Sequence, residues 1–228
     1  MKSSVPMNTI TWLGHAAFKI ESNNRVIFID PWIKGNPVSP LKSSKDISKA
    51  DLVFVTHDHG DHGFKDAVRI CRKNKAIFVG VFELANKARR KLVKKSVGGN
   101  IGGEIKIDGI KVYFTPAWHS SHIATPCGFI IKTPEITIYH TGDTGFYSDM
   151  EYLRKLYDID VMLLPICSNY MMGIEEATWT VEKVKPKTVI PMHYNTFPLL
   201  NADAEEFKTK IGKIANVEIL SVGESFSL

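Results

Sequence analysis

The sequence contains few cysteines, no long apolar run and no low-complexity tract, and each absence excludes a class of protein. The three cysteines, Cys71, Cys127 and Cys167, are far apart, which argues against a disulfide framework and for a reducing compartment. No stretch of about 18 uninterrupted apolar residues occurs, so no membrane-spanning helix is expected. Residues 1–6 lack the apolar segment of a signal peptide. We therefore expect a cytoplasmic protein with no membrane partner.

Charge of neither sign dominates the chain. The 228 residues include 29 basic and 24 acidic side chains, a net charge of +5. The segment Lys87–Lys95 is locally basic, but Leu84, Ala88 and Leu92 recur at helical spacing. This favours a solvated helix face over a nucleic-acid patch. No linker rich in Pro, Gly or Ser interrupts the sequence, so residues 1–228 are predicted to form one domain.

The hydrophobic pattern predicts strands first, then alternating helices and strands, in each half of the chain. Strands are expected over 9–13, 17–21, 25–30, 52–56, 76–80, 104–107, 111–115, 128–132, 136–141, 161–164, 188–192 and 217–220. Helices are expected over 63–73, 83–95, 148–157, 175–184 and 204–215. The pattern alone indicates an α/β or α+β protein. Its order suits two sheets packed face to face with helices outside each, a four-layer sandwich.

The eight histidines are not scattered at random along the sequence. Most of them fall at the end of a predicted apolar strand or just after one: His15, His57, His59, His62, His119, His122, His140 and His193. Strand ends are the places where a sheet presents side chains to a shared cleft. The histidines are therefore the first candidates for a functional site.

The densest group follows the predicted strand 52–56, where three histidines and two aspartates occupy six positions. In an extended segment His57 and His59 point the same way, while Gly60 permits a sharp turn. Asp61 and His62 then face differently, so the motif offers two imidazoles to one metal and a carboxylate plus an imidazole to a neighbour. Imidazole and carboxylate suit Zn²⁺, Mn²⁺ or Fe²⁺. A set of plain polar turn residues would not require this density.

Three further residues follow later strands and can complete the ligand set. His119 comes after the strand 111–115, Asp143 after 136–141 and His193 after 188–192. A single histidine is more often a hydrogen-bonded structural residue than a ligand. Together with the dense motif, however, these residues favour a metal site assembled from distant segments.

The order of these residues resembles the signature of the metallo-β-lactamase superfamily, whose fold is a four-layer αββα sandwich. A closer resemblance, over nearly the whole chain, is to the UPF0173 family of metal-dependent hydrolases, which is similar to the ascorbate-6-phosphate lactonase branch. It is carried by WLGHAAF at 12–18, IDPW at 29–32, PAWHSS at 116–121, HTGDT at 140–144 and IPMHYNTF at 190–197. One departure is the segment 166–173, which lacks an acidic residue common in the family.

The resemblance implies two divalent ions, of Zn, Mn or Fe, as cofactors. It places His57, His59 and His119 on the first metal, Asp61, His62 and His193 on the second, and Asp143 as the bridge. Two such ions would lower the pKa of a shared water toward neutrality and so supply a hydroxide for attack on a carbonyl or phosphoryl centre. We expect Asp61 to orient this nucleophile or to accept its proton.

The remaining polar residues near these motifs have more than one interpretation. His15 is expected to bind substrate, to protonate the leaving group, or to serve a structural role. Asp30 is expected to hydrogen-bond a ligand imidazole, and His140 to support a ligand rather than to be one. His122 faces either the cleft or solvent, and Cys167 is read as a small buried residue rather than a nucleophile.

We therefore predict an enzyme, a dinuclear hydrolase acting on a small anionic ester such as a phosphodiester or a lactone. One alternative is an iron-dependent redox protein of the same fold. Another is a nuclease or nucleic-acid-binding protein, which the compact chain disfavours because it has no inserted second domain or RNA-gripping arm. A third is a non-catalytic metal-binding or scaffold protein, which would have lost ligands. The sequence is compatible with a homo-oligomer.

Overall fold

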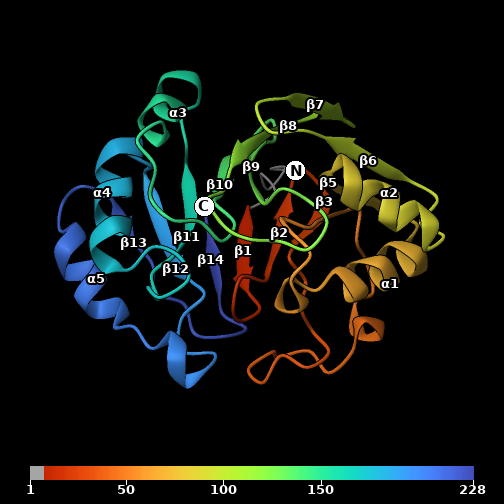
Figure 1. Ribbon diagram of the computed structural model, residues 1–228, viewed down its shortest axis with the longest axis horizontal. Coiled ribbons are helices and arrows are strands. Elements are labelled where there is room, and N and C mark those ends of the chain that lie inside the picture. Colours follow the sequence, from red (N-terminus) through yellow and green to blue (C-terminus); the bar gives the residue numbers. More distant parts are fainter. Residues whose placement is uncertain (1–7) are drawn as a thin grey trace, which may run out of the picture.

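The computed structural model describes residues 8–228 and shows two sheets packed face to face between two layers of helices (Figure 1). This is the four-layer α/β sandwich expected from the sequence. Residues 1–7, on which the expectation about a signal peptide rested, lie outside the described part. Among the described residues, no helix is both long and apolar enough to cross a bilayer.

The first sheet is antiparallel at one edge and parallel at the other. Its seven strands lie in the order β14 (Ser225–Ser227), β1 (Thr9–Trp12), β2 (Phe18–Ser22), β3 (Arg25–Ile29), β4 (Leu52–Phe54), β5 (Ile77–Val81) and β6 (Ser96–Gly99). Pairing is antiparallel from β14 to β3 and parallel from β3 to β6. Asn23 and Asn24 form the two-residue turn between β2 and β3 with φ of 49° and 58°. Asparagine tolerates this left-handed conformation, which matches the twist of a hairpin.

The second sheet repeats this plan. Its order is β13 (Asn216–Val217), β12 (Thr188–Met192), β11 (Val161–Pro165), β10 (Thr137–His140), β9 (Cys127–Lys132), β8 (Ile110–Pro116) and β7 (Glu104–Ile107). Strands β10 to β13 are parallel and β7 to β10 antiparallel. Every residue of β11 and β12 is buried, as expected for parallel strands covered on both faces.

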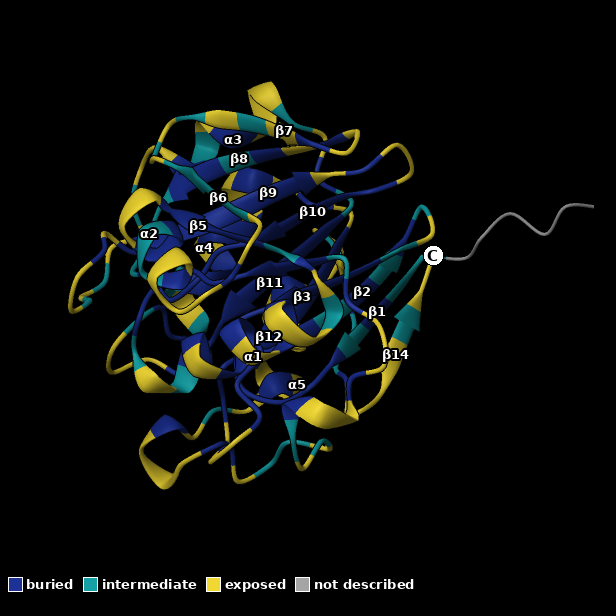
Figure 2. Cartoon of the chain, turned by 90° about the vertical axis from the view of Figure 1, so that its right-hand side faces the viewer, coloured by how far each residue is buried: buried dark blue, intermediate teal, exposed yellow. Residues whose placement is uncertain are grey.

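Helices cover the outer face of each sheet (Figure 1). The first sheet carries α1 (Phe64–Asn74) and α2 (Phe82–Arg90), and the second carries α3 (Met150–Leu156), α4 (Ile174–Val184) and α5 (Ala204–Ile211). Figure 2 shows their inward faces buried and their outward faces exposed. Between the sheets the rings of Phe54 and Phe129 meet edge to face, with centroids 5.2 Å apart. The sheets therefore form the core, and the strand ends and loops remain for the site.

Several predicted boundaries were wrong. The helix expected over 83–95 ends at Arg90, because Leu92 takes a left-handed φ of 65° and is 72% exposed. The basic segment Lys87–Lys95 is therefore helical only in its first half. The strand β6 that follows was missed, and α5 ends at Ile211, before Gly212, which has a φ of 55°.

Candidate metal centre

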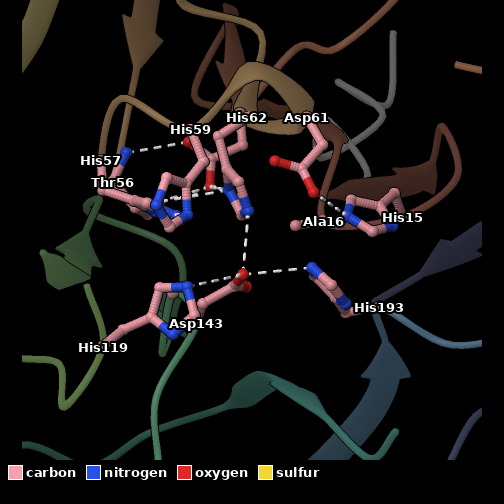
Figure 3. A network of polar contacts seen from close by, with 12 residues as sticks. His15, Ala16, Thr56, His57, His59, Asp61, His62, His119, Asp143 and His193 are labelled. Atoms are coloured by element: carbon pink, nitrogen blue, oxygen red, sulfur yellow. Dashed lines mark hydrogen bonds and ion pairs between the residues drawn. The ribbon is translucent and has the colours of Figure 1, made fainter. Parts of the chain in front are cut away.

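The residues expected to bind metal meet at one edge of the sandwich, where four strands end. The loop after β4 carries the motif His57–His62, and the segments after β8, β10 and β12 carry His119, Asp143 and His193. Figure 3 shows these side chains converging from separate elements, with the Asp143 carboxylate among them. Within the second sheet β10 and β12 are both parallel to β11, so they end at the same edge. The end of β4, in the first sheet, faces that edge across the sandwich.

Three imidazoles form the first group of potential ligands. His57 Nε2 lies 3.0 Å from His59 Nδ1, and one ring nitrogen from each of His57, His59 and His119 falls within 4.8 Å of the others. Burial lowers the pKa of His57 well below its ordinary value, so its ring is neutral. His119 Nδ1 donates to the Tyr170 carbonyl at 3.2 Å, which leaves Nε2 as the lone-pair nitrogen facing the group.

The second group surrounds Asp143. Its Oδ2 lies 3.0 Å from His62 Nε2, 3.1 Å from His193 Nε2 and 3.8 Å from His119 Nε2. Burial alone would raise the pKa of Asp143, but His193 and His62 outweigh it and hold that pKa well below its usual range. For His193, burial by itself would lower the pKa, but the charge of Asp143 raises it to about 10. The carboxylate therefore draws positive charge into a buried place, as a cation site does.

Asp61 completes this group together with a buried partner. Asp61 Oδ2 lies 3.2 Å from His15 Nε2, and these atoms are within 4.8 Å of ligand atoms of His62 and His193. Burial lowers the pKa of His15 to about 4, so the ring is neutral, donates from Nε2 to Asp61 and accepts at Nδ1 from the Thr196 hydroxyl at 3.0 Å. The His15 side chain is fully buried behind Asp61, whose own side chain is 34% exposed.

Hydrogen bonds behind the ligands fix their orientation. His62 Nδ1 lies 2.8 Å from Asp30 Oδ2, so Asp30 contacts the imidazole of a predicted ligand. Asp30 also accepts from the Thr56 backbone N–H at 2.8 Å and from the Thr56 hydroxyl at 2.7 Å. With Nδ1 engaged, His62 presents Nε2 to the cluster. Such outer partners set the tautomer and ring direction of metal ligands.

The unsatisfied atoms of the cluster fit a bound cation. Among the described residues, Asp143 Oδ1 and His193 Nε2 are buried polar atoms without a hydrogen-bond partner. The His193 contact with Asp143 is within ion-pair distance but lacks hydrogen-bond geometry. Buried polar atoms without partners are rare and costly, whereas a cation would satisfy both atoms. The imidazole and carboxylate donors are those that Zn²⁺, Mn²⁺ and Fe²⁺ accept.

The neighbouring residues with open roles have distinct positions. His140 is buried, with Nε2 3.0 Å from the Ala16 carbonyl and Nδ1 accepting from Gly142 N–H; it therefore supports the turn that carries Asp143. His122 is exposed, although its ring lies 5.3 Å from that of His59. Cys167 is buried, and its Sγ lies 3.5 Å from His193 Nδ1, so it contacts a predicted ligand from behind.

Sequence reasoning missed the role of Asp58, a buried residue between the predicted ligands His57 and His59 in the sequence. Its Oδ1 accepts from the Ser121 hydroxyl at 2.5 Å and from His122 N–H at 2.9 Å, and its Oδ2 accepts from Lys87 Nζ at 3.1 Å. These bonds tie the loop after His119 to the motif. The density of the motif indicated Asp58 as one of several polar residues after β4. That its carboxylate binds Ser121, His122 and Lys87 depends on the tertiary fold.

The cluster opens into a cavity of about 520 Å³. The polar part of its lining comes from the candidate ligands and their neighbours, His59, Gly60, Asp61, His119, Ser120, Asp143 and His193. A larger cavity of about 710 Å³ lies elsewhere, beside α1, and has a strongly basic lining that contains none of the predicted site residues. The smaller cavity is the one that gives a substrate access to the cluster.

The fold and the cluster together define a metallo-hydrolase of the β-lactamase type. The profile of the family described as "Beta-lactamase superfamily domain" matches residues 9–193. The chain belongs to this superfamily and, within it, to the UPF0173 metal-dependent hydrolases. It is 46% identical to a "UPF0173 metal-dependent hydrolase" of Caldivirga maquilingensis over 227 residues, covering 97% of this chain and 99% of the relative.

Two other relatives support the same assignment. A "UPF0173 metal-dependent hydrolase" of Pelotomaculum thermopropionicum is 46% identical over 231 residues, covering 96% of this chain and 99% of that one. The solved structure of Igni18, described as a novel metallo hydrolase from the archaeon Ignicoccus hospitalis, is 39% identical and superposes with a TM-score of 0.90. That match covers 97% of this chain and 98% of Igni18. The protein is therefore a metal-dependent hydrolase.

Proposed function

We propose that this metal-dependent hydrolase uses a dinuclear centre to cleave a small anionic ester, either a phosphodiester or a lactone. His57, His59 and His119 would hold one ion, Asp61, His62 and His193 the other, and Asp143 would bridge them. The observation that carries this proposal is the position of Asp143, whose Oδ2 lies 3.0 to 3.8 Å from ring nitrogens of both groups. A carboxylate shared by two sets of donors is an arrangement that suits a pair of cations.

The charge of the centre favours an anionic substrate. When bound, two divalent ions supply Lewis acidity, which lowers the pKa of water and polarises a carbonyl or phosphoryl oxygen. Asp61 and Asp143 offset about half of the roughly four positive charges that two divalent ions bring. A net positive cavity therefore attracts phosphate or carboxylate groups. The donor chemistry is compatible with Zn²⁺, Mn²⁺ and Fe²⁺.

The residues of this chain contribute proton handling and orientation. Asp61 is the only one of the two centre carboxylates with substantial exposure to the cavity, at 34% against 3% for Asp143. It is therefore placed to orient the nucleophile or to accept its proton. His15 donates to Asp61 from a buried position and does not line the cavity. We assign His15 as a positioning residue that holds Asp61; the Asp61 carboxylate requires the proton on Nε2, and the Thr196 hydroxyl donates to Nδ1.

The test is metal reconstitution followed by a substrate screen. Protein freed of metal is loaded separately with Zn²⁺, Mn²⁺ or Fe²⁺, and hydrolysis of a phosphodiester, a lactone and a thioester is measured. We expect turnover of the phosphodiester or the lactone with Zn²⁺ or Mn²⁺. Activity only with iron, coupled to oxygen consumption, would support the redox alternative instead.

Two variants sharpen this test. Asp143→Ala should lose at least one of the two ions and lose hydrolysis, whereas Asp51→Asn, at the residue that precedes β4, should keep both metal content and hydrolysis. Asp51 accepts from Val26 N–H and contacts no residue of the cluster. Retention of metal and of every detected hydrolysis by Asp143→Ala contradicts the assignment of the centre.

A further inference from the structure

One wall of the cavity beside the metal centre is apolar. It is formed by two loops, the one after β11 with Tyr170 and Met171, and the one after β12 with Phe197, Leu199 and Leu200. The rest of the lining holds the candidate ligands and their neighbours. The cavity therefore presents a polar, metal-binding side and an apolar side to the same small molecule.

Three side chains of this wall are open to water. Tyr170 is 58% exposed, Leu199 is 61% exposed and Phe197 is 40% exposed. Leaving large apolar side chains in water forgoes the free energy that their burial would give. A cluster of such side chains beside a polar site marks a surface that a ligand covers.

The wall is fixed to the centre rather than loosely attached to it. The Tyr170 carbonyl accepts from His119 Nδ1 at 3.2 Å, so the loop that carries Tyr170 also orients a predicted metal ligand. The Phe197 ring lies 5.9 Å from Trp32 and 6.0 Å from His15, centroid to centroid. A substrate group resting on this wall is thereby held at a defined position relative to the ligands.

Fixed positive side chains are missing from this cavity. Among the described residues that line it there is no lysine or arginine, in contrast to the basic cavity beside α1. An anionic group finds a partner only at the centre, where the metals bind. A substrate with negative charges spread along its length would leave those charges unpaired against the apolar wall.

We propose that the substrate carries one anionic ester head and an apolar alkyl or aryl group, which packs against Tyr170, Phe197 and Leu199. This inference rests on the proposed function, since the metal centre receives the head. A cavity of about 520 Å³ is within the size range that encloses such a molecule.

The test compares methylphosphonate with hexylphosphonate by calorimetry on the metal-loaded protein. Burial of one methylene contributes about 0.8 kcal/mol, or roughly fourfold in affinity. Because the wall stays partly open to water, we expect about half of this energy, which corresponds to about a twofold gain in affinity per methylene. Five added methylenes should therefore tighten binding by roughly 30-fold. In parallel, hydrolysis of methyl and hexyl p-nitrophenyl phosphate is measured.

Two leucine variants provide a matched pair. Leu199→Gln removes part of the wall and should reduce the hexyl-to-methyl affinity ratio to about tenfold or less. Leu156→Gln makes the same change at a leucine that is 65% exposed at the end of α3, outside the cavity. This control should keep the full ratio.

The outcomes separate the two proposals. Equal affinity for both phosphonates, with hydrolysis of the diesters intact, overturns the apolar subsite and leaves the proposed function standing. A 30-fold preference for hexylphosphonate that Leu199→Gln reduces, without hydrolysis of either diester or of the lactone in the substrate screen, supports the subsite and overturns the proposed function. Failure of both phosphonates to bind, with no hydrolysis of the diesters or of the lactone, overturns both.

Discussion

Asp30→Asn is the substitution that most sharply separates an effect on the orientation of the predicted ligands from an effect on the stability of the fold. Asp30 is fully buried with a left-handed φ of 45°, a conformation that asparagine tolerates better than most residues. Backbone strain and side-chain volume therefore hardly change. What changes is the hydrogen bonding of one oxygen and the charge of the group.

The magnitude follows from the three hydrogen bonds that Asp30 accepts. They come from Thr56 N–H, the Thr56 hydroxyl and His62 Nδ1–H, at 2.7 to 2.8 Å. An asparagine amide has a single acceptor oxygen, so its NH₂ group must face at least one of these donors. Loss of a carboxylate behind a metal-binding imidazole reduces metal affinity by about 10- to 100-fold, or roughly 1.4 to 2.7 kcal/mol. Loss of a charge-assisted hydrogen bond also lowers the free energy of unfolding, by about 1.5 to 3 kcal/mol.

The assay is competition for Zn²⁺ with a chromophoric chelator, measured beside urea unfolding of the metal-free protein. Asp51→Asn is the control, because Asp51 also accepts a backbone N–H of β3 but lies away from the cluster. We expect a weaker Zn²⁺ affinity only for Asp30→Asn. An affinity that stays within twofold of wild type, while stability falls, would refute the idea that Asp30 acts through His62.

Two further predictions concern the frame around the site. Gly63→Ala should lower the free energy of unfolding, measured in urea, by about 3 kcal/mol, because φ is 67° and a Cβ would lie 2.4 Å from the Pro31 carbonyl carbon and from Trp32 N. The control Gly109→Ala, with φ of 85° and no atom within 4 Å of the added Cβ, should lower it by only about 1 kcal/mol. Equal losses in the two variants would contradict a steric role for Gly63. Burial raises the pKa of the Cys71 thiol from 9.0 to about 12, so this thiol ionises at a lower pH in the unfolded chain than in the folded one. The free energy of unfolding should therefore fall between pH 9 and 11, by roughly 2 to 3 kcal/mol more than in Cys71→Ala. An identical pH dependence of stability in the two proteins would show that folding does not keep the thiol neutral.

The first part of the fold that sequence predicts well is the set of long apolar strands. The strands 161–164 and 188–192 were nearly right because fully buried parallel strands are continuous apolar runs. In contrast, β6 contains Gly98 and Gly99, which have no apolar side chain to signal a strand. Their small size is required there, since a Cβ on Gly99 would lie 2.3 Å from the Phe114 ring.

The candidate site divides in the same way between local and distant information. The spacing of His57, His59, Asp61 and His62 is local, so a pattern of residue types was sufficient to indicate ligands. The bond between His15 and Thr196 joins residues 181 positions apart, and nothing in either segment indicates the other. Burial of His15 behind Asp61 likewise depends on the tertiary fold.

The most direct test of the account is the number of divalent ions that the folded chain holds, counted by native mass spectrometry after loading with Zn²⁺ or Mn²⁺. We predict two ions on the wild-type chain and no more than one on Asp143→Ala, because that carboxylate lies between both groups of ligands. A wild-type chain that takes up no ion, or an Asp143→Ala chain that holds two as tightly as wild type, would contradict the dinuclear centre.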